Sequence, residues 1–208
     1  MAEKYDIEKY NRRLKKFFDD DEYRYYHTQG VRYTAAALAM AHGEDYQDAE
    51  LAGLLHDSAK NIPDPKKIKL CEKNDIPITP VERENVYLLH AKLGAYIARK
   101  KYKVEDEDIL NAITYHTTGR PAMSRLEQII FIADYIEPRR FKAPDLSEVR
   151  KVAFHDLDEC CYIILRDSVE YLRSKGGRID EMTEQAFCYY EKLHTERTGK
   201  TPDISNEE

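Results

Sequence analysis

The stretch Leu51–Lys60, LAGLLHDSAK, places a histidine and an aspartate at the end of the most apolar part of the chain. Residues 51–55 are apolar or small on every side of a helix, which is typical of a helix that is buried all round. Gly53 and Ala52 would let a neighbouring helix approach closely. Because a buried imidazole and carboxylate must be paired or bound to something, the stretch predicts a helical core with a polar site at the end of one helix.

Working outward, apolar residues recur at helical spacing along most of the chain, and no long segment alternates apolar with polar residues. Ser124 and Glu127 have the spacing of a capping box, and Gly176-Gly177 is a helix-ending signal. We expect an all-α protein, a compact bundle rather than a solenoid, because no internal repeat is visible. The predicted helices cover residues 5–18, 22–42, 46–59, 64–73, 91–102, 105–116, 125–136, 146–174 and 182–194.

Length and composition argue against several classes of protein, among them membrane-spanning and disulfide-rich proteins. The chain has 208 residues, enough for one hydrophobic core, and its net charge of −6 supplies no overall positive field for DNA or RNA. No apolar run reaches membrane-spanning length, and the N-terminal residues show no apolar signal-peptide core. The four cysteines form no C-x-x-C pair, which favours a reducing cytoplasm over a disulfide scaffold or a zinc–thiolate site.

The predicted helices and the composition of the C-terminal residues also indicate a domain organisation. Residues 1–20 are expected to form an N-terminal helix that packs on the main domain, residues 21–195 the domain itself, and residues 196–208 a mobile tail. The tail, which includes ERTGKTPDISNEE, has almost nothing to bury.

Four further polar residues stand in apolar surroundings: His27 in YRYYHTQGVRYTA, His90 in VYLLHAKLGAYIA, His116 in AITYHTTGR, and Asp134 in LEQIIFIADYIEP. Each alone is explained as a hydrogen-bonded core histidine or a solvated aspartate. Together with His56-Asp57 they indicate a shared site, since imidazole nitrogen and carboxylate oxygen suit iron, manganese, nickel, zinc or cobalt. Ligands from different helices would meet inside a bundle, where such centres are built.

The dipeptide His-Asp occurs a second time, as His155-Asp156 in FHDLDECC, beside Asp158 and Glu159. This acidic context predicts an exposed helix surface, so the second copy serves as an internal control.

The order His, His-Asp, His, His, Asp resembles that of the HD-domain metal-dependent phosphohydrolase superfamily. The segments LAGLLHDSAK, LLHAKLGAYIA, NAITYHTTGRPAMS and LEQIIFIADYIEPRR are similar to the YqeK family, the symmetrical bis(5′-nucleosyl)-tetraphosphatases of bacteria, over about residues 24–178. The resemblance implies an HD-type helical bundle that uses iron to cleave diadenosine tetraphosphate into two ADP. Manganese or another first-row metal, one or two ions, and ADP- or GDP-type products stay open.

The resemblance also assigns residues. It implies four metal ligands, His27, His56, Asp57 and Asp134. It implies substrate contacts at Arg24, Asp57, Ser58, Ala59, Lys60, His90, His116, Thr117, Arg140 and Arg178, with His90, His116 and Lys60 as catalytic residues. His90 and His116 either hold a second metal or contact the phosphates, and either Arg139 or Arg140 faces the substrate.

The chemistry needs a water activated by a divalent metal, and local cations to neutralise a polyphosphate. Two alternatives are an HD phosphohydrolase that acts on a nucleoside monophosphate or a guanine alarmone, and a nucleotide sensor without catalysis. Whichever function holds, a homodimer is a further expectation for this protein. Tyr23, Tyr25 and Tyr26 cluster beside His27, where a ring could stack on a base, although such tyrosines more often belong to the core or its rim.

Overall fold

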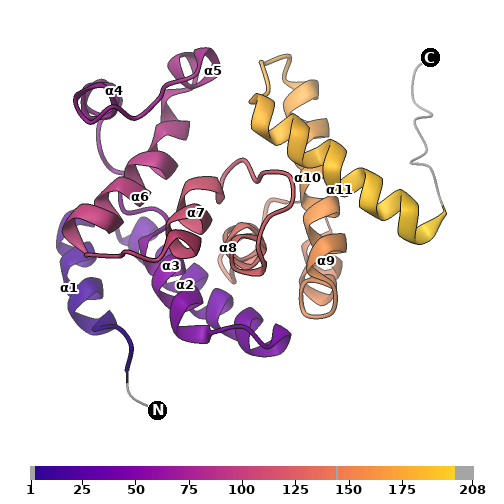
Figure 1. Ribbon diagram of the computed structural model, residues 1–208, viewed down its shortest axis with the longest axis horizontal. Helices are drawn as coiled ribbons and strands as arrows, with labels where there is room; N and C mark the ends of the chain where they lie inside the picture. Colours follow the sequence, from indigo (N-terminus) through magenta and orange to yellow (C-terminus); the bar gives the residue numbers. More distant parts are fainter. Residues whose placement is uncertain (1–2, 144, 200–208) are drawn as a thin grey trace.

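The computed structural model describes residues 3–143 and 145–199, and within these ranges the protein is entirely helical, which confirms the all-α prediction (Figure 1). Residues 1–2 of the predicted N-terminal segment and 200–208 of the predicted tail lie outside the described residues. No described helix has the length and apolar character that crossing a bilayer requires. The elements are α1 (Ile7–Phe18), α2 (Glu22–His42), α3 (Tyr46–Leu55), α4 (Asp64–Lys73), α5 (Pro80–Glu84), the 3-10 helix η1 (Val86–Leu88), α6 (Leu89–Lys101), α7 (Glu107–Tyr115), α8 (Arg125–Ile136), α9 (Leu146–Ala153), α10 (Leu157–Ser174) and α11 (Glu181–Thr198).

Helix α8 lies at the centre of the bundle and contacts α2, α3, α7, α9 and α10 (Figure 1). Its residues 126–133 are all buried, as expected for a helix surrounded by others. The capping box predicted at its start is present: Ser124 Oγ accepts a hydrogen bond from Glu127 N at 3.1 Å, and Glu127 Oε2 accepts one from Ser124 N at 2.6 Å. The fixed start of α8 sets the position of Asp134 farther along it.

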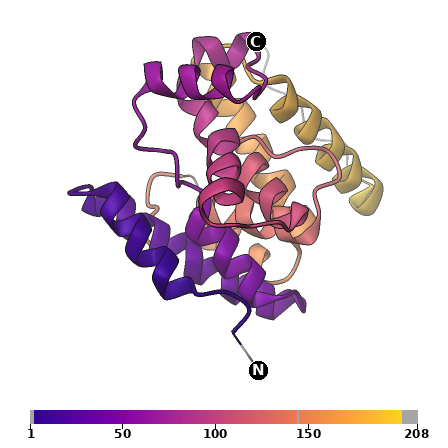
Figure 2. The ribbon, with the colours of Figure 1, turned by 60° about the vertical axis from the view of Figure 1, so that its left-hand side comes forward.

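The close helix approach expected at Gly53 is present between α2 and α3. A Cβ atom on Gly53 would lie 3.0 Å from Arg32 Cα and 3.2 Å from the carbonyl oxygen of Val31, so any side chain would push the helices apart. Helix α1 packs beside this pair, with Leu14 and Phe18 buried in the core (Figure 2).

Two predicted helices end earlier than expected. The helix predicted for 46–59 stops at Leu55, and a run of tight turns follows, with Ser58 N bonded to Leu55 O at 3.0 Å and Lys60 N to Asp57 O at 2.9 Å. The helix predicted for 146–174 is two helices, because Asp156 caps the second by accepting from Glu159 N at 3.0 Å. His155-Asp156 therefore lies in a turn between helices, and its prediction as a helix surface was wrong.

The short elements α5 and η1 were missed. Thr79 and Glu82 form a capping box, and Pro80 stands in the first turn of α5, where a proline is tolerated because that N–H has no helical partner.

Candidate active site

Six polar side chains converge between the ends of five segments, and we call them the polar cluster. His27 comes from α2, His56 and Asp57 from the turns after α3, His90 from the first turn of α6, His116 from the end of α7, and Asp134 from α8. Five of the six are buried, and the Asp134 side chain is 22% exposed. The structure thus brings together every residue of the predicted His/Asp set.

Three histidines of the cluster are oriented in the same way. His56 and His116 each place Nδ1 2.7 Å from the backbone carbonyl oxygen three residues earlier, and His90 makes the same contact with Tyr87. Since a carbonyl oxygen only accepts, Nδ1 carries the hydrogen and the lone pair of Nε2 points into the cluster. This is the arrangement that prepares an imidazole as a metal ligand or a hydrogen-bond acceptor.

His27 is oriented by a residue that the sequence analysis missed. Its Nδ1 lies 3.1 Å from Oε1 of the buried Glu137, whose other oxygen accepts from Arg139 N at 2.7 Å. A Cβ atom on Gly30 would collide with this carboxylate, so the glycine one turn after His27 provides the room. Burial raises the pKa of Glu137, but its hydrogen bond with His27 and that from Arg139 N outweigh this and lower it, so Glu137 is an anion.

One side of the cluster holds donor atoms without hydrogen-bond partners. His27 Nε2 lies 3.1 Å from Asp134 Oδ1 and 3.7 Å from Asp57 Oδ2, while His56 Nε2 lies 3.5 Å from Asp57 Oδ2 and 4.0 Å from Asp134 Oδ1. Within the described residues, neither of these buried nitrogens has a hydrogen-bond partner. Unpaired imidazole nitrogens that face carboxylate oxygens around one shared point fit a divalent cation, which accepts lone pairs from all of them.

Both carboxylates of the cluster are ionised. Burial alone would raise their pKa values, but the adjacent imidazoles, and for Asp134 also Arg140, lower both well below the usual 3.8. His27 shows the converse: burial lowers its pKa, and the adjacent carboxylates of Asp134 and Glu137 outweigh that and raise it. The site therefore carries the negative charge that a cation would compensate.

On the other side of the cluster the imidazole nitrogens are already hydrogen-bonded, although Asp57 Oδ1 has no hydrogen-bond partner within the described residues. Asp57 Oδ1 lies 3.2 Å from His90 Nε2 and 3.7 Å from His116 Nε2, but Lys60 Nζ is 3.2 Å from His90 Nε2 and Thr117 Oγ1 is 3.1 Å from His116 Nε2. Burial lowers the pKa of His90 to about 4, so this imidazole is neutral at pH 7, and burial also lowers the pKa of Lys60. Asp57 presents one oxygen to each side.

Three arginines border the cluster. The guanidinium of Arg24 pairs with Asp57 Oδ2, and Arg140 donates from Nη2 to Asp134 Oδ1 at 2.8 Å and from Nε to the Asp134 carbonyl oxygen at 3.0 Å. Arg139 instead lies over the ring of Tyr26, 5.0 Å from its centroid. Of the two neighbouring arginines, Arg140 is the one directed at the carboxylates.

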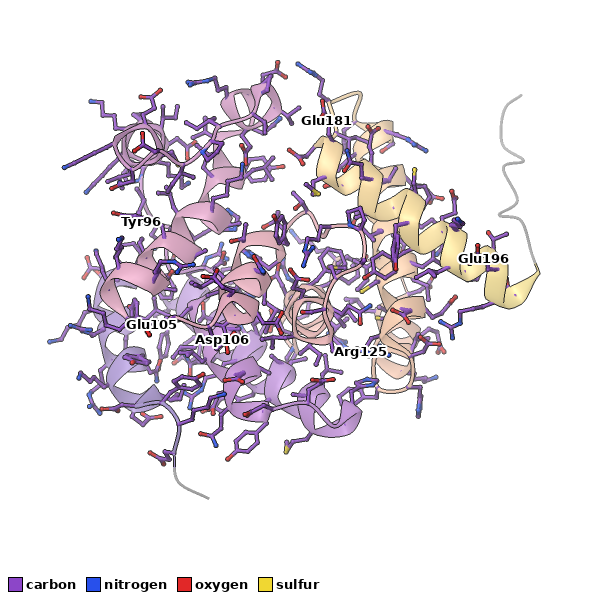
Figure 3. All side chains as sticks on the ribbon, in the orientation of Figure 1. Tyr96, Glu105, Asp106, Arg125, Glu181 and Glu196 are labelled. Atoms are coloured by element: carbon purple, nitrogen blue, oxygen red, sulfur yellow. The ribbon has the colours of Figure 1, made fainter. Side chains whose placement is uncertain are left out.

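Ser58 and Arg178 each have a partner outside the polar cluster. Ser58 Oγ donates to the Gly94 carbonyl oxygen at 3.5 Å, and the predicted contact Ala59 is fully buried. Arg178 pairs with Glu84 Oε1 at 3.0 Å and lines a cavity of about 320 Å³ whose wall also includes Thr117. The first turn of α11, marked by Glu181 in Figure 3, forms another part of that wall.

Comparisons with known proteins give a consistent picture. The model of the family described as HD domain matches residues 24–139, a range that includes the whole polar cluster. Symmetrical bis(5′-nucleosyl)-tetraphosphatases are 42% identical in Bacillus subtilis (74% of this chain, 82% of the relative) and 44% identical in Halalkalibacterium halodurans (76% and 83%). A crystal structure from Clostridium acetobutylicum, described as a predicted HD superfamily hydrolase involved in NAD metabolism, superposes with a TM-score of 0.85 at 39% identity, covering 91% of this chain and 98% of that one. The bundle therefore has the fold of that hydrolase, as the sequence predicted.

Proposed function

The chain belongs to the HD-domain family, and we propose that it is a symmetrical bis(5′-nucleosyl)-tetraphosphatase, which hydrolyses diadenosine tetraphosphate at its central anhydride. The observation that carries the proposal is the polar cluster, in which buried imidazole nitrogens without hydrogen-bond partners face two ionised carboxylates. The products would be two molecules of ADP.

A divalent metal is the cofactor that this donor set fits, and we propose iron. Its ligands would be His27, His56, Asp57 and Asp134, since the unpaired nitrogens are on this side of the cluster. When bound, such an ion lowers the pKa of a coordinated water and compensates negative charge on a phosphate. On the other side, Lys60 and Thr117 already bond the imidazole nitrogens, which supports a phosphate site rather than a second metal there.

Other residues of the chain would neutralise phosphate charge, donate a proton and bind a nucleoside. Lys60 and Arg140 lie at the two carboxylates of the cluster, and they would neutralise the phosphates on either side of the bond that breaks. Because burial lowers the pKa of Lys60, its ammonium is a better proton donor than a solvated lysine, and His116 is the second candidate for protonating the leaving ADP. The cavity beside Thr117, lined by Lys92 and Arg178, would hold one nucleoside.

The reaction is tested with the purified protein, diadenosine tetraphosphate and iron(II) or manganese(II) in ¹⁸O-labelled water. ADP as the sole product, with one labelled oxygen for each substrate cleaved, is expected. AMP together with ATP would contradict symmetrical cleavage. Turnover of a nucleoside monophosphate or a guanine alarmone in its place would favour another HD phosphohydrolase, and tight binding without turnover would favour a sensor.

The metal count is tested by elemental analysis of the protein as purified. We expect one equivalent of metal for each chain, whereas two equivalents would overturn the assignment of His90 and His116 to the phosphates. We also propose a cytoplasmic location, supported by four cysteines that are all free thiols. The homodimer stays a prediction, and light scattering would test it by measuring the molar mass of the protein in solution.

A further inference from the structure

We propose that the exposed rings of Tyr23 and Tyr26, together with the guanidinium of Arg139, form a stacking site for the second purine nucleoside of the substrate. We call these three residues the tyrosine platform. The inference rests on the proposed function, because only a dinucleoside brings two bases to one active site.

The histidines of the polar cluster form a row with two ends. The centroids of neighbouring rings are 5.4 Å apart for His27 and His56, 5.0 Å for His56 and His116, and 5.0 Å for His116 and His90. Thr117, whose Oγ1 lies 3.4 Å from His90 Nε2 and 3.1 Å from His116 Nε2, and the cavity of about 320 Å³ lie at the His90 end. A substrate that is cut at its centre extends equally in both directions, so a nucleoside in this cavity directs the other nucleoside to the His27 end.

The tyrosine platform lies at that end. Tyr26 directly precedes His27 in α2, and the guanidinium of Arg139 is 5.0 Å from the centroid of its ring. The backbone N–H of Arg139 donates to Glu137, the carboxylate that orients His27. Tyr23 stands three residues before Tyr26, on the same face of the helix. Arg139 thus links the Tyr26 ring to the carboxylate that orients the metal ligand.

The platform has the chemistry of a base-binding surface. Tyr23 and Tyr26 are 52% and 47% exposed, so their rings keep free faces even though Arg139 lies over one of them. Aromatic rings and guanidinium planes stack on any base, which gives binding without a strong base preference. The neighbouring Arg24 and Arg140, which pair with Asp57 and Asp134, place two guanidinium groups at this end of the site in a chain of net charge −6, where they can also donate to phosphate oxygens.

The test compares KM and kcat for diadenosine tetraphosphate. Tyr26→Ala should raise KM about tenfold, since stacking on an aromatic ring accounts for roughly that factor for each base, and should change kcat little because the cluster is untouched. Tyr26→Phe keeps the ring and should recover most of the lost affinity. The matched control is Tyr33→Ala, on the same helix: Tyr33 is 59% exposed and has the guanidinium of Arg32 4.8 Å from its ring, but stands two turns farther on. Its KM should equal that of the wild type.

A second probe separates the two ends of the site. Adenosine 5′-tetraphosphate carries the same number of phosphates with one base, which the cavity would take, so its dissociation constant should be the same for Tyr26→Ala and the wild type. Equal KM values for Tyr26→Ala and Tyr33→Ala would overturn the tyrosine platform while leaving the proposed function intact. So would a Tyr26→Ala variant that loses affinity for adenosine 5′-tetraphosphate by the same factor as for diadenosine tetraphosphate. Failure of the wild type to cleave the dinucleotide would overturn both.

Discussion

The dipeptides His56-Asp57 and His155-Asp156 each follow the end of a helix, the apolar α3 and the amphipathic α9, and they differ in their burial and in their contacts. His56 and Asp57 are 0% and 2% exposed, whereas His155 is exposed and the Asp156 side chain is 30% exposed. Asp57 faces imidazoles carried by α2, α6 and α7. Asp156 caps α10 and pairs with Arg197 at the surface.

The difference shows that the dipeptide itself does not make a site. What distinguishes Asp57 is the set of helices that pack around it, which Gly53 permits by letting α2 approach α3. The site they enclose holds two imidazole nitrogens, His27 Nε2 and His56 Nε2, that have no hydrogen-bond partner among the described residues. The Asp156 carboxylate instead accepts from a backbone N–H of α10 and from the exposed guanidinium of Arg197, as an ordinary helix cap does.

The largest expected effect separates the two aspartates. Asp57→Ala should lose the bound metal and reduce the rate of hydrolysis by on the order of a thousandfold or more, because metal-ion catalysis supplies several kcal/mol. Asp156→Ala should retain both metal and rate. Elemental analysis and ADP release check the pair, and equal damage from the two substitutions would show that the wrong dipeptide was assigned.

A second pair concerns the carboxylates that orient histidines. Glu137→Ala should weaken metal binding by about 10- to 100-fold, since it releases His27 from its orienting partner. Glu159→Ala is the matched control, because Glu159 Oε2 holds His194 Nδ1 at 2.8 Å in a pair that lies outside the polar cluster. Metal titration followed by calorimetry gives both affinities. A similar loss in both variants would mean that Glu137 acts through general stability.

Close packing beside the first dipeptide gives a stability test. Gly53→Ala should cost about 1–3 kcal/mol, because its Cβ would press on backbone atoms of α2. Gly177→Ala, where a Cβ would meet nothing within 4 Å, should change stability by less than about 0.5 kcal/mol. Urea denaturation measures the difference. Tolerance of both substitutions would contradict the role given to the α2–α3 contact.

The smallest effect belongs to the control dipeptide. Asp156→Ala should destabilise the fold by about 1 kcal/mol at pH 7, through loss of the cap on α10. The hydrogen bond from Arg197 lowers the pKa of Asp156 below its ordinary 3.8, so this stabilisation is present above that value and is lost as the pH falls through the lowered pKa. Denaturation at pH 7 and pH 3 should show the wild type and the variant converging at the lower pH. If the difference in unfolding free energy between the wild type and Asp156→Ala were larger at pH 3 than at pH 7, the role of Asp156 as an ionised helix cap would be contradicted.

Helical periodicity and the His/Asp set that forms the polar cluster could be predicted from the sequence because each depends on local pattern or on residue type. The start of α8 was predicted from its capping box, and the small residues of LAGLL predicted a close helix contact. The break before Asp156 could not be predicted in the same way, since apolar residues keep their helical spacing across it and only the capping hydrogen bond ends α9.

Contacts between distant segments explain the rest of what the sequence left out. Glu137 contacts His27, which stands 110 positions earlier in the chain. The one sequence feature near the pair that relates to this contact is Gly30, where a side chain would collide with the Glu137 carboxylate. The distinction between Arg139 and Arg140 likewise depends on which guanidinium reaches Asp134, a matter of backbone direction after α8.

The central claim is that His27, His56, Asp57 and Asp134 together bind one divalent ion. Diffraction data collected on either side of the metal absorption edge test it most directly. We predict a single anomalous peak within bonding distance of both Nε2 nitrogens and both carboxylates. Crystals of active protein with no peak there, or with the ion bound elsewhere, would contradict the account.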